Sequence, residues 1–147
     1  MKKERKELIE KIRRKRTWLL NFHRLLLKND PQMLEKWDEL YSAGKFRERF
    51  ISAREKELVD LAISAIMRWG PGLQIHIKKA IDLGITEAEI SEIFSLAAMS
   101  AGIPCMMFAA DVYEEMKRNH FAYSFPQFRI DEQPPVRKHS PRIVKGG

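Results

Sequence analysis

The chain has 147 residues, of which 44% are hydrophobic, and a formal net charge of +7. This length fits one domain with one hydrophobic core, and the apolar content excludes wholesale disorder. The single cysteine, Cys105, excludes an intramolecular disulfide and a zinc finger, and so few thiols fit a reducing, cytoplasmic compartment.

The first third of the chain is expected to be helical, because strand signals are nearly absent and apolar residues recur at helical spacing. Residues 3–28 have the three-to-four spacing typical of one long helix or two. Asp30 before Pro31 predicts the N-cap and first position of another helix, which Gly44 ends. One face of that helix is expected to carry Leu34, Trp37, Leu40 and Tyr41.

Two capping boxes, at residues 52–55 and 86–89, predict the starts of two further helices. The Gly-Pro-Gly sequence at 70–72 is expected to end the first of them, and a shorter helix is predicted over residues 73–83. The second capping box opens a helix that stops at Gly102, and Pro104 opens a last helix to about residue 118. The expected core face of the first capped helix is Leu58, Leu61, Ala62, Ala65 and Ile66.

From residue 121 onward the helical period fails. We expect an extended tail whose aromatic start packs on the body or on a neighbouring subunit, and whose last ten or so residues are mobile. The predicted fold is therefore an all-α bundle of about six helices with an irregular C-terminal tail. It divides into an N-terminal helical extension (1–45), a helical core (46–120) and the tail (121–147).

The positive charge lies at the two ends of the chain. Residues 1–16 carry +6 and residues 133–147 carry +4, so the middle of the chain is mildly acidic. We interpret the basic ends as solvated segments, which disfavours a nucleic-acid partner. The N-terminus has no apolar segment typical of a signal peptide. The uncharged run 93–110 contains a Gly-Ile-Pro break, so we expect a buried helix pair or a subunit interface there and not a membrane span.

One segment is more specific than the rest, namely His76-Ile-Lys-Lys-Ala-Ile-Asp-Leu-Gly-Ile-Thr-Glu-Ala-Glu-Ile-Ser-Glu92. Together with residues 54–63 upstream, and with Ala97-Ala98 and residues 102–104 downstream, it resembles the carboxymuconolactone decarboxylase family, which includes the alkylhydroperoxidase D-like proteins. The resemblance covers about residues 50–115. It implies an alkylhydroperoxidase D-like helical fold, and relatives in this family form rings of three or six subunits.

The peroxide-reducing branch of the family has a Cys-x-x-Cys pair just before the histidine. The corresponding positions here are Trp69 and Gly72, and thiol–disulfide chemistry needs both an attacking and a resolving thiol. Cys105 lies in an apolar run and is interpreted as a small buried hydrophobe. Peroxiredoxin-type activity is therefore the least favoured function.

The decarboxylase branch needs no cysteine, and resemblance to it implies a small organic acid or lactone as substrate, no cofactor, and a histidine near the chemistry. Loss of carbon dioxide requires a cradle for a carboxylate and a general acid, a role that suits His76. Glu57 on the preceding helix is the candidate to orient it across an antiparallel helix pair. These two residues are the predicted catalytic site.

Each candidate also has a purely structural interpretation. A lone histidine is often a satisfied interior or surface group, and Glu57 belongs to a charged helix start that is normally solvated. Lys78 and Lys79 suit an anionic substrate, although a solvated helix face is the favoured explanation for them. We predict no metal site, because the other histidines (His23, His120 and His139) have no partner at ligand spacing. The methionines and the phenylalanine at 99, 106, 107 and 108 are interpreted as packing residues.

Two functions of different class stay open at this point. The first is a cofactor-free decarboxylase or lactone-processing enzyme, and the second is a non-catalytic oligomeric scaffold or small-molecule-binding member of the family. In both, the expected partner is the protein itself, as a trimer or hexamer. The apolar run 93–110, with Trp18, Leu20 and Leu27, is expected to meet a neighbouring subunit. The scarcity of Asn and Cys beside abundant Lys, Arg, Glu and Ile is typical of thermophile proteins.

Overall fold

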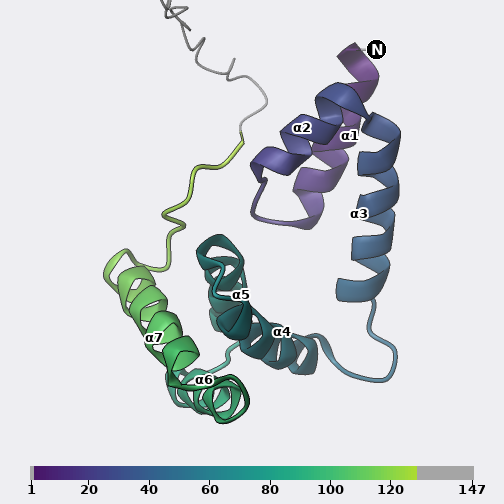
Figure 1. Ribbon diagram of the computed structural model, residues 1–147. Helices are drawn as coiled ribbons and strands as arrows, with labels where there is room; N and C mark the ends of the chain where they lie inside the picture. The colour runs from purple at the N-terminus through teal and green to yellow at the C-terminus, as the bar shows by residue number, and fades with distance from the viewer. Residues whose placement is uncertain (1, 129–147) are drawn as a thin grey trace, which may run out of the picture.

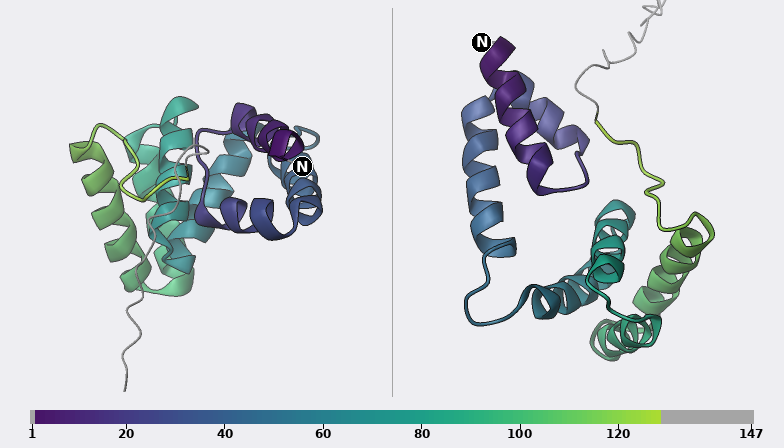
Figure 2. Two further views of the ribbon diagram at one scale, coloured as in Figure 1. Left: turned by 90° about the horizontal axis from the view of Figure 1, so that it is seen from above. Right: turned by 180° about the vertical axis from the view of Figure 1, so that it is seen from behind.

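Seven α-helices make up the part of the chain that the computed structural model describes, which is residues 2–128, and this part contains no strand. They form two groups that lie side by side, α1–α3 and α4–α7, joined by the loop between α3 and α4 (Figure 1, Figure 2). The helices are α1 (Lys2–Lys15), α2 (Asn21–Asn29), α3 (Pro31–Lys45), α4 (Ala53–Met67), α5 (Gly70–Asp82), α6 (Glu87–Ala101) and α7 (Ile103–Arg118). The predicted all-α bundle is confirmed.

The N-terminal group contains two helices before α3, so the alternative of one long helix over residues 3–28 is wrong. The chain leaves helical geometry after Lys15 and re-enters it after Leu20, whose backbone is extended. The break allows Arg16 to turn inward, where it is buried beside Asp38 of α3. The predicted cap of α3 is confirmed, because the Asp30 side chain accepts a hydrogen bond from the Met33 amide at 3.0 Å.

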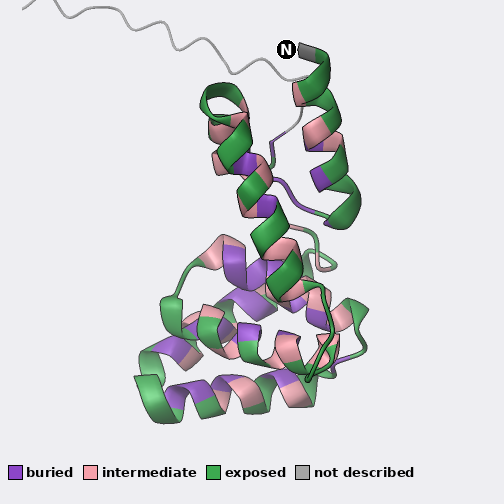
Figure 3. Ribbon diagram, turned by 90° about the vertical axis from the view of Figure 1, so that its right-hand side faces the viewer, coloured by how far each residue is buried: buried purple, intermediate pink, exposed green. Residues whose placement is uncertain are grey.

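The second group holds the larger core, built from inward faces of α4–α7. Both predicted capping boxes are present and fix where α4 and α6 begin. Buried and exposed residues alternate along these helices, as Figure 3 shows. The core centres on a contiguous set of apolar side chains that includes Leu61, Leu73, Ile77, Phe94 and Met116. No described helix is both long and apolar enough to cross a bilayer, and the run 93–110 is divided between α6 and α7 at Gly102.

The connection between α4 and α5 differs from the prediction. α4 already ends at Met67, and Arg68 takes a left-handed conformation with φ of 51°. Gly70-Pro71-Gly72 is the first turn of α5 and not the terminator of α4. A proline is favourable there, because the first turn of a helix has no intrahelical partner for its N–H groups.

One predicted core position is wrong, because Ile66 is 42% exposed. Leu40, expected on the same face of α3 as Leu34, is 75% exposed. Both helices therefore bury a narrower face than their apolar spacing indicates. Trp18, expected at a neighbouring subunit, is buried within its own chain.

The aromatic start of the tail packs on the body, as predicted. Phe121 and Tyr123 lie against the larger core, and Phe128 is buried with Ile9 and Ile12 of α1. The Phe128 amide also donates a hydrogen bond to the Leu19 carbonyl at 3.0 Å. The tail therefore runs from the end of α7 back to the N-terminal group (Figure 1). The predicted mobility of the last ten or so residues falls outside the described residues.

His23 on α2 is fully buried among aromatic rings, with Phe22, Trp18 and Trp37 around it. Its Nδ1 accepts a hydrogen bond from the Leu20 amide at 3.1 Å, which caps the start of α2. Burial, followed by the nearby positive charge of Arg16, lowers the pKa of His23 from 6.5 to about 4. His23 is therefore held neutral in the folded protein.

This burial predicts a loss of stability in mild acid. Between about pH 6.5 and about pH 4 the unfolded chain binds a proton at His23 that the folded chain does not, so the free energy of unfolding falls by up to about 1.4 kcal/mol per pH unit as the pH decreases. The control is His23→Gln, whose side-chain oxygen can accept the same amide but does not titrate. Denaturant unfolding at several pH values should show a steeper loss for the wild type. If the free energy of unfolding fell equally with decreasing pH in the wild type and in His23→Gln, this account would be contradicted.

Candidate functional site

The site begins on α4, where two carboxylates one turn apart lie on the inner face of the helix. Glu57 is completely buried and Asp60 is 7% exposed. Both follow the capping box at Ser52 and share one face of α4 with the buried residues Leu61 and Ala65, because residues three and four apart lie on the same side of a helix. The solvated helix start, which was the structural interpretation of Glu57, is therefore wrong. Asp60, three residues later on the same face, is a site residue that the sequence analysis missed.

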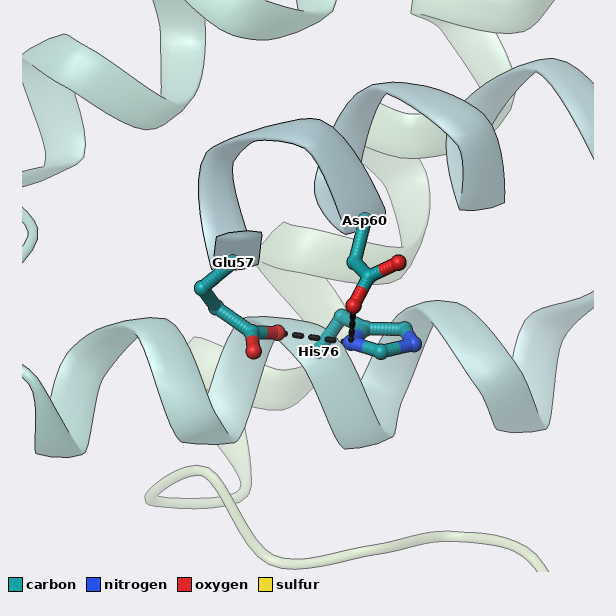
Figure 4. A group of neighbouring side chains, drawn as sticks. All are labelled: Glu57, Asp60 and His76. Atoms are coloured by element: carbon teal, nitrogen blue, oxygen red, sulfur yellow. Dashed lines mark hydrogen bonds and ion pairs between the residues drawn. The ribbon is translucent and has the colours of Figure 1, made fainter. Parts of the chain in front are cut away.

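His76 lies on the neighbouring helix α5 and faces both carboxylates (Figure 4). Its Nδ1 lies 2.6 Å from Oε1 of Glu57 and 3.9 Å from Oδ2 of Asp60. An ionised carboxylate can only accept, so Nδ1 carries the hydrogen of the short bond. The other ring nitrogen, Nε2, points away from the two acids in Figure 4. The predicted juxtaposition of Glu57 and His76 is confirmed, while their catalytic role stays a prediction.

Two lysines balance the two carboxylates. The Lys79 ammonium lies 3.1 Å from Oε2 of Glu57 and forms an ion pair with it. The geometry of this contact is not that of a hydrogen bond, so Oε2 accepts none in the described structure. Lys45, at the end of α3, is paired with Oδ1 of Asp60. Buried acids need such partners, because removing an unpaired charge from water is very costly. Lys79 thus serves the site and not a solvated face, whereas Lys78 pairs with Asp82 at 3.6 Å.

Glu57, Asp60 and His76 are also the residue types that bind metals, and one ligand atom from each lies within 4.8 Å of the others. The two neighbouring ammonium groups already neutralise both acids, so a divalent cation would enter a group without net negative charge. The charges thus disfavour a metal, and its predicted absence stays a prediction. His23 lies in its own aromatic cluster, His120 is exposed, and His139 lies outside the described residues.

A cavity of about 200 Å³ lies beside His76. The cavity lies between α5 and the segment that joins α1 to α2, so residues of both helix groups line it. The lining is cationic and aromatic: Lys15, Arg16, Thr17, Trp18, Tyr41, Phe46, Ile75, His76, Lys79, Asp82 and Tyr123. The N-terminal part of this lining was not anticipated from the sequence.

Two tyrosines keep their protons in this cavity. Burial raises the pKa of Tyr41 to about 12 and also raises the pKa of Tyr123. The Tyr123 hydroxyl is 2.9 Å from the Thr17 hydroxyl, which ties the tail to the segment after α1. Both phenols are thus neutral groups that can donate hydrogen bonds at physiological pH.

The positions that correspond to the thiol pair of the peroxide-reducing relatives lie against each other. The indole of Trp69 covers Gly72 so closely that a Cβ atom at Gly72 would lie 2.4 Å from Cε3 of the ring. A cysteine at position 72 would therefore require Trp69 to move. Cys105, on α7, is buried in the larger core and unpaired, in agreement with its interpretation as a packing residue.

The comparisons with known proteins identify the family. Residues 31–115, more than half of the chain, match the carboxymuconolactone decarboxylase family, so the chain belongs to that family. The match begins earlier than the resemblance found at residues 50–115, and it therefore includes α3 as well as α4–α6 and most of α7. No curated protein and no solved structure matches the chain significantly.

We predict that Cys105 supports no peroxide reduction, because it is buried and the chain contains no second thiol. Pure protein should consume an organic hydroperoxide no faster than the Cys105→Ser variant, measured with a dithiol reductant and a coupled peroxide assay. A wild-type activity that Cys105→Ser abolishes would overturn this prediction.

Proposed function

We propose that this member of the carboxymuconolactone decarboxylase family is a cofactor-free decarboxylase or lactone-processing enzyme that acts on a small organic acid. The observation that carries the proposal is the 2.6 Å bond between Nδ1 of His76 and the buried carboxylate of Glu57. A carboxylate in this position orients an imidazole and leaves its second nitrogen for a substrate. The histidine lines a cavity, which is where a proton donor or acceptor must lie to react.

In the proposed decarboxylation, His76 is the general acid. The bond between the substrate carbon and its carboxylate breaks, carbon dioxide leaves, and the electron pair moves into a conjugated carbonyl. The protonated imidazole then donates the proton on Nε2 to the substrate carbon. The carboxylates of Glu57 and Asp60 stabilise the imidazolium before this transfer. In a lactone-opening or isomerising reaction, the same nitrogen in its neutral form would act as the base.

Lys79 has a supporting part in this proposal. Its ammonium pairs with Oε2 of Glu57 and so offsets the cost of burying this carboxylate, while Oε1 of the same group holds the imidazole. Lys79 also lines the cavity, where its positive charge favours an anionic substrate.

We predict that His76→Ala abolishes turnover and that Glu57→Gln lowers kcat by about 10²-fold or more, since general acid–base catalysis contributes on this scale. Glutamine keeps the size of Glu57 but removes the charge that orients and stabilises the imidazolium. The measurement is a screen of small lactones and keto acids, followed by carbon dioxide release and product analysis. His120 is an exposed histidine that does not line the cavity, so His120→Ala is the control and should keep wild-type rates. Full activity of His76→Ala on a confirmed substrate would refute the assignment.

The second candidate, an oligomeric scaffold or binding protein, is favoured by a separate observation. Large apolar side chains are exposed on three helices of the second group, α4, α6 and α7: Val59, Ile63, Met67, Leu96, Met99, Ile103 and Met107. Exposed apolar surface of this kind is typical of subunit interfaces. We propose that these faces join copies of the chain, in a trimer or hexamer. Assembly is compatible with catalysis, and the substrate screen separates an active oligomer from an inert one.

For the assembly we predict that the pure protein scatters light as a species well above 17.3 kDa at micromolar concentration. The interface is expected to exceed about 2,000 Å² in total, as obligate apolar interfaces do. Met99→Glu combined with Met107→Glu should dissociate it, because each charge would be buried without a partner. The matched control is Leu40→Glu, at an equally exposed leucine on α3. A monomeric wild type would remove the assembly proposal.

A further inference from the structure

Arg16 is the most unusual charged residue of the described structure. Its side chain is only 1% exposed, and Nη2 pairs with Oδ1 of Asp38. The other two nitrogens, Nε and Nη1, are buried and have no hydrogen-bond partner. Buried donors are normally paired, because leaving one unsatisfied is costly. A guanidinium with two unpaired nitrogens therefore indicates a missing acceptor.

Aromatic rings hold this guanidinium in place. Its central carbon lies 4.8 Å from the ring centroid of Tyr41, 5.1 Å from that of Trp18, 5.6 Å from that of Trp37 and 5.8 Å from that of Phe46. Rings at these distances attract a cation and restrict its movement. They cannot accept hydrogen bonds as a carboxylate does, so the unpaired nitrogens remain without an acceptor.

The charges around Arg16 leave one positive charge unmatched. Lys15 lies 2.6 Å from Oδ2 of Asp38, so Lys15 and Arg16 share the single carboxylate of that residue. Both cations line the cavity of about 200 Å³ that His76 also lines. Lys15 and Arg16 therefore supply positive charge on one side of the cavity, with the unpaired nitrogens of Arg16 buried in that wall, and α5 supplies a histidine.

We propose that Arg16 binds the carboxylate of a small planar acid, aromatic or conjugated, whose remainder extends toward His76. A carboxylate is the acceptor that fits a guanidinium best. The flat walls of Trp18, Tyr41 and Tyr123 favour a flat molecule, and the volume is below the usual range for drug-sized ligands. This inference rests on the proposed function, because it names the substrate class of the same cavity. It assigns the anion subsite to residues 15–18, which precede the family match at residues 31–115.

The direct test is calorimetric titration of the full chain with benzoate, in a buffer free of other carboxylates. Two matched probes test what the cavity recognises. Benzamide has the same shape as benzoate without the charge, and cyclohexanecarboxylate has the charge without the flat ring. We expect benzoate to bind more tightly than either. Absent benzoate binding, or equal binding of benzoate and benzamide, would overturn the proposal.

Two variants separate binding from folding. Arg16→Gln combined with Asp38→Asn removes the buried ion pair as a unit, so that only the partly exposed Lys15 loses its carboxylate partner, and it should weaken benzoate binding about tenfold or more. Asp38→Asn alone keeps Arg16 and removes its competing acid, so it should bind benzoate as tightly as the wild type or more tightly. If Asp38→Asn loses as much affinity as the double variant, Arg16 has a structural role only and the proposal fails. Should the double variant not fold, the Nε–H resonance of Arg16 in the wild type decides, because benzoate must shift it.

Turnover distinguishes this subsite from the proposed reaction. Benzoate binding that depends on Arg16, in a protein that converts no acid or lactone, would support the subsite and refute the enzyme. Conversely, an active enzyme whose KM does not change in the double variant would support the enzyme and refute the subsite.

Discussion

A carboxylate without any exposed surface, that of Glu57, determines how this helical bundle is arranged around its site. A buried charge is tolerated only where partners replace water, and Glu57 has two of them on α5: His76 on one oxygen and Lys79 on the other. Each partner needs α5 to lie antiparallel to α4 with a fixed rotation. The left-handed turn at Arg68 brings α5 back to that position. The same interaction therefore fixes a helix pair and orients an imidazole.

The N-terminal group completes the site from the opposite side. Lys45 at the end of α3 pairs with Asp60, and the segment after α1 forms the far wall of the cavity beside His76. The tail closes this arrangement, because Tyr123 contacts Thr17. In the proposed function, the wall made of a buried guanidinium and aromatic rings would select charge and shape, while the histidine opposite it would supply the proton chemistry. Recognition and reaction would then come from different helix groups.

Features determined by neighbouring residues were predictable from the sequence, whereas features determined by distant residues were not. The caps at Asp30, Ser52 and Thr86 are local and were found. The Gly-Pro-Gly turn was misplaced because such a sequence suits the end of one helix and the start of the next. The spacing of Glu57 and Asp60 on one helix face was available as a signal, but their charges pointed to a solvated face. The burial of Arg16 depends on rings more than twenty residues away, which no local pattern reveals.

The central claim is that buried Glu57 holds the hydrogen of His76 on Nδ1 and leaves Nε2 for the substrate. Nitrogen NMR of histidine-labelled protein tests it without knowledge of the substrate, because the two ring nitrogens have distinct shifts in each tautomer. We predict for His76 a protonated Nδ1 with a strongly downfield proton, and an unprotonated Nε2 when the ring is neutral. In Glu57→Gln this downfield proton should disappear. A neutral His76 protonated on Nε2 in the wild type, unchanged in Glu57→Gln, would contradict the account.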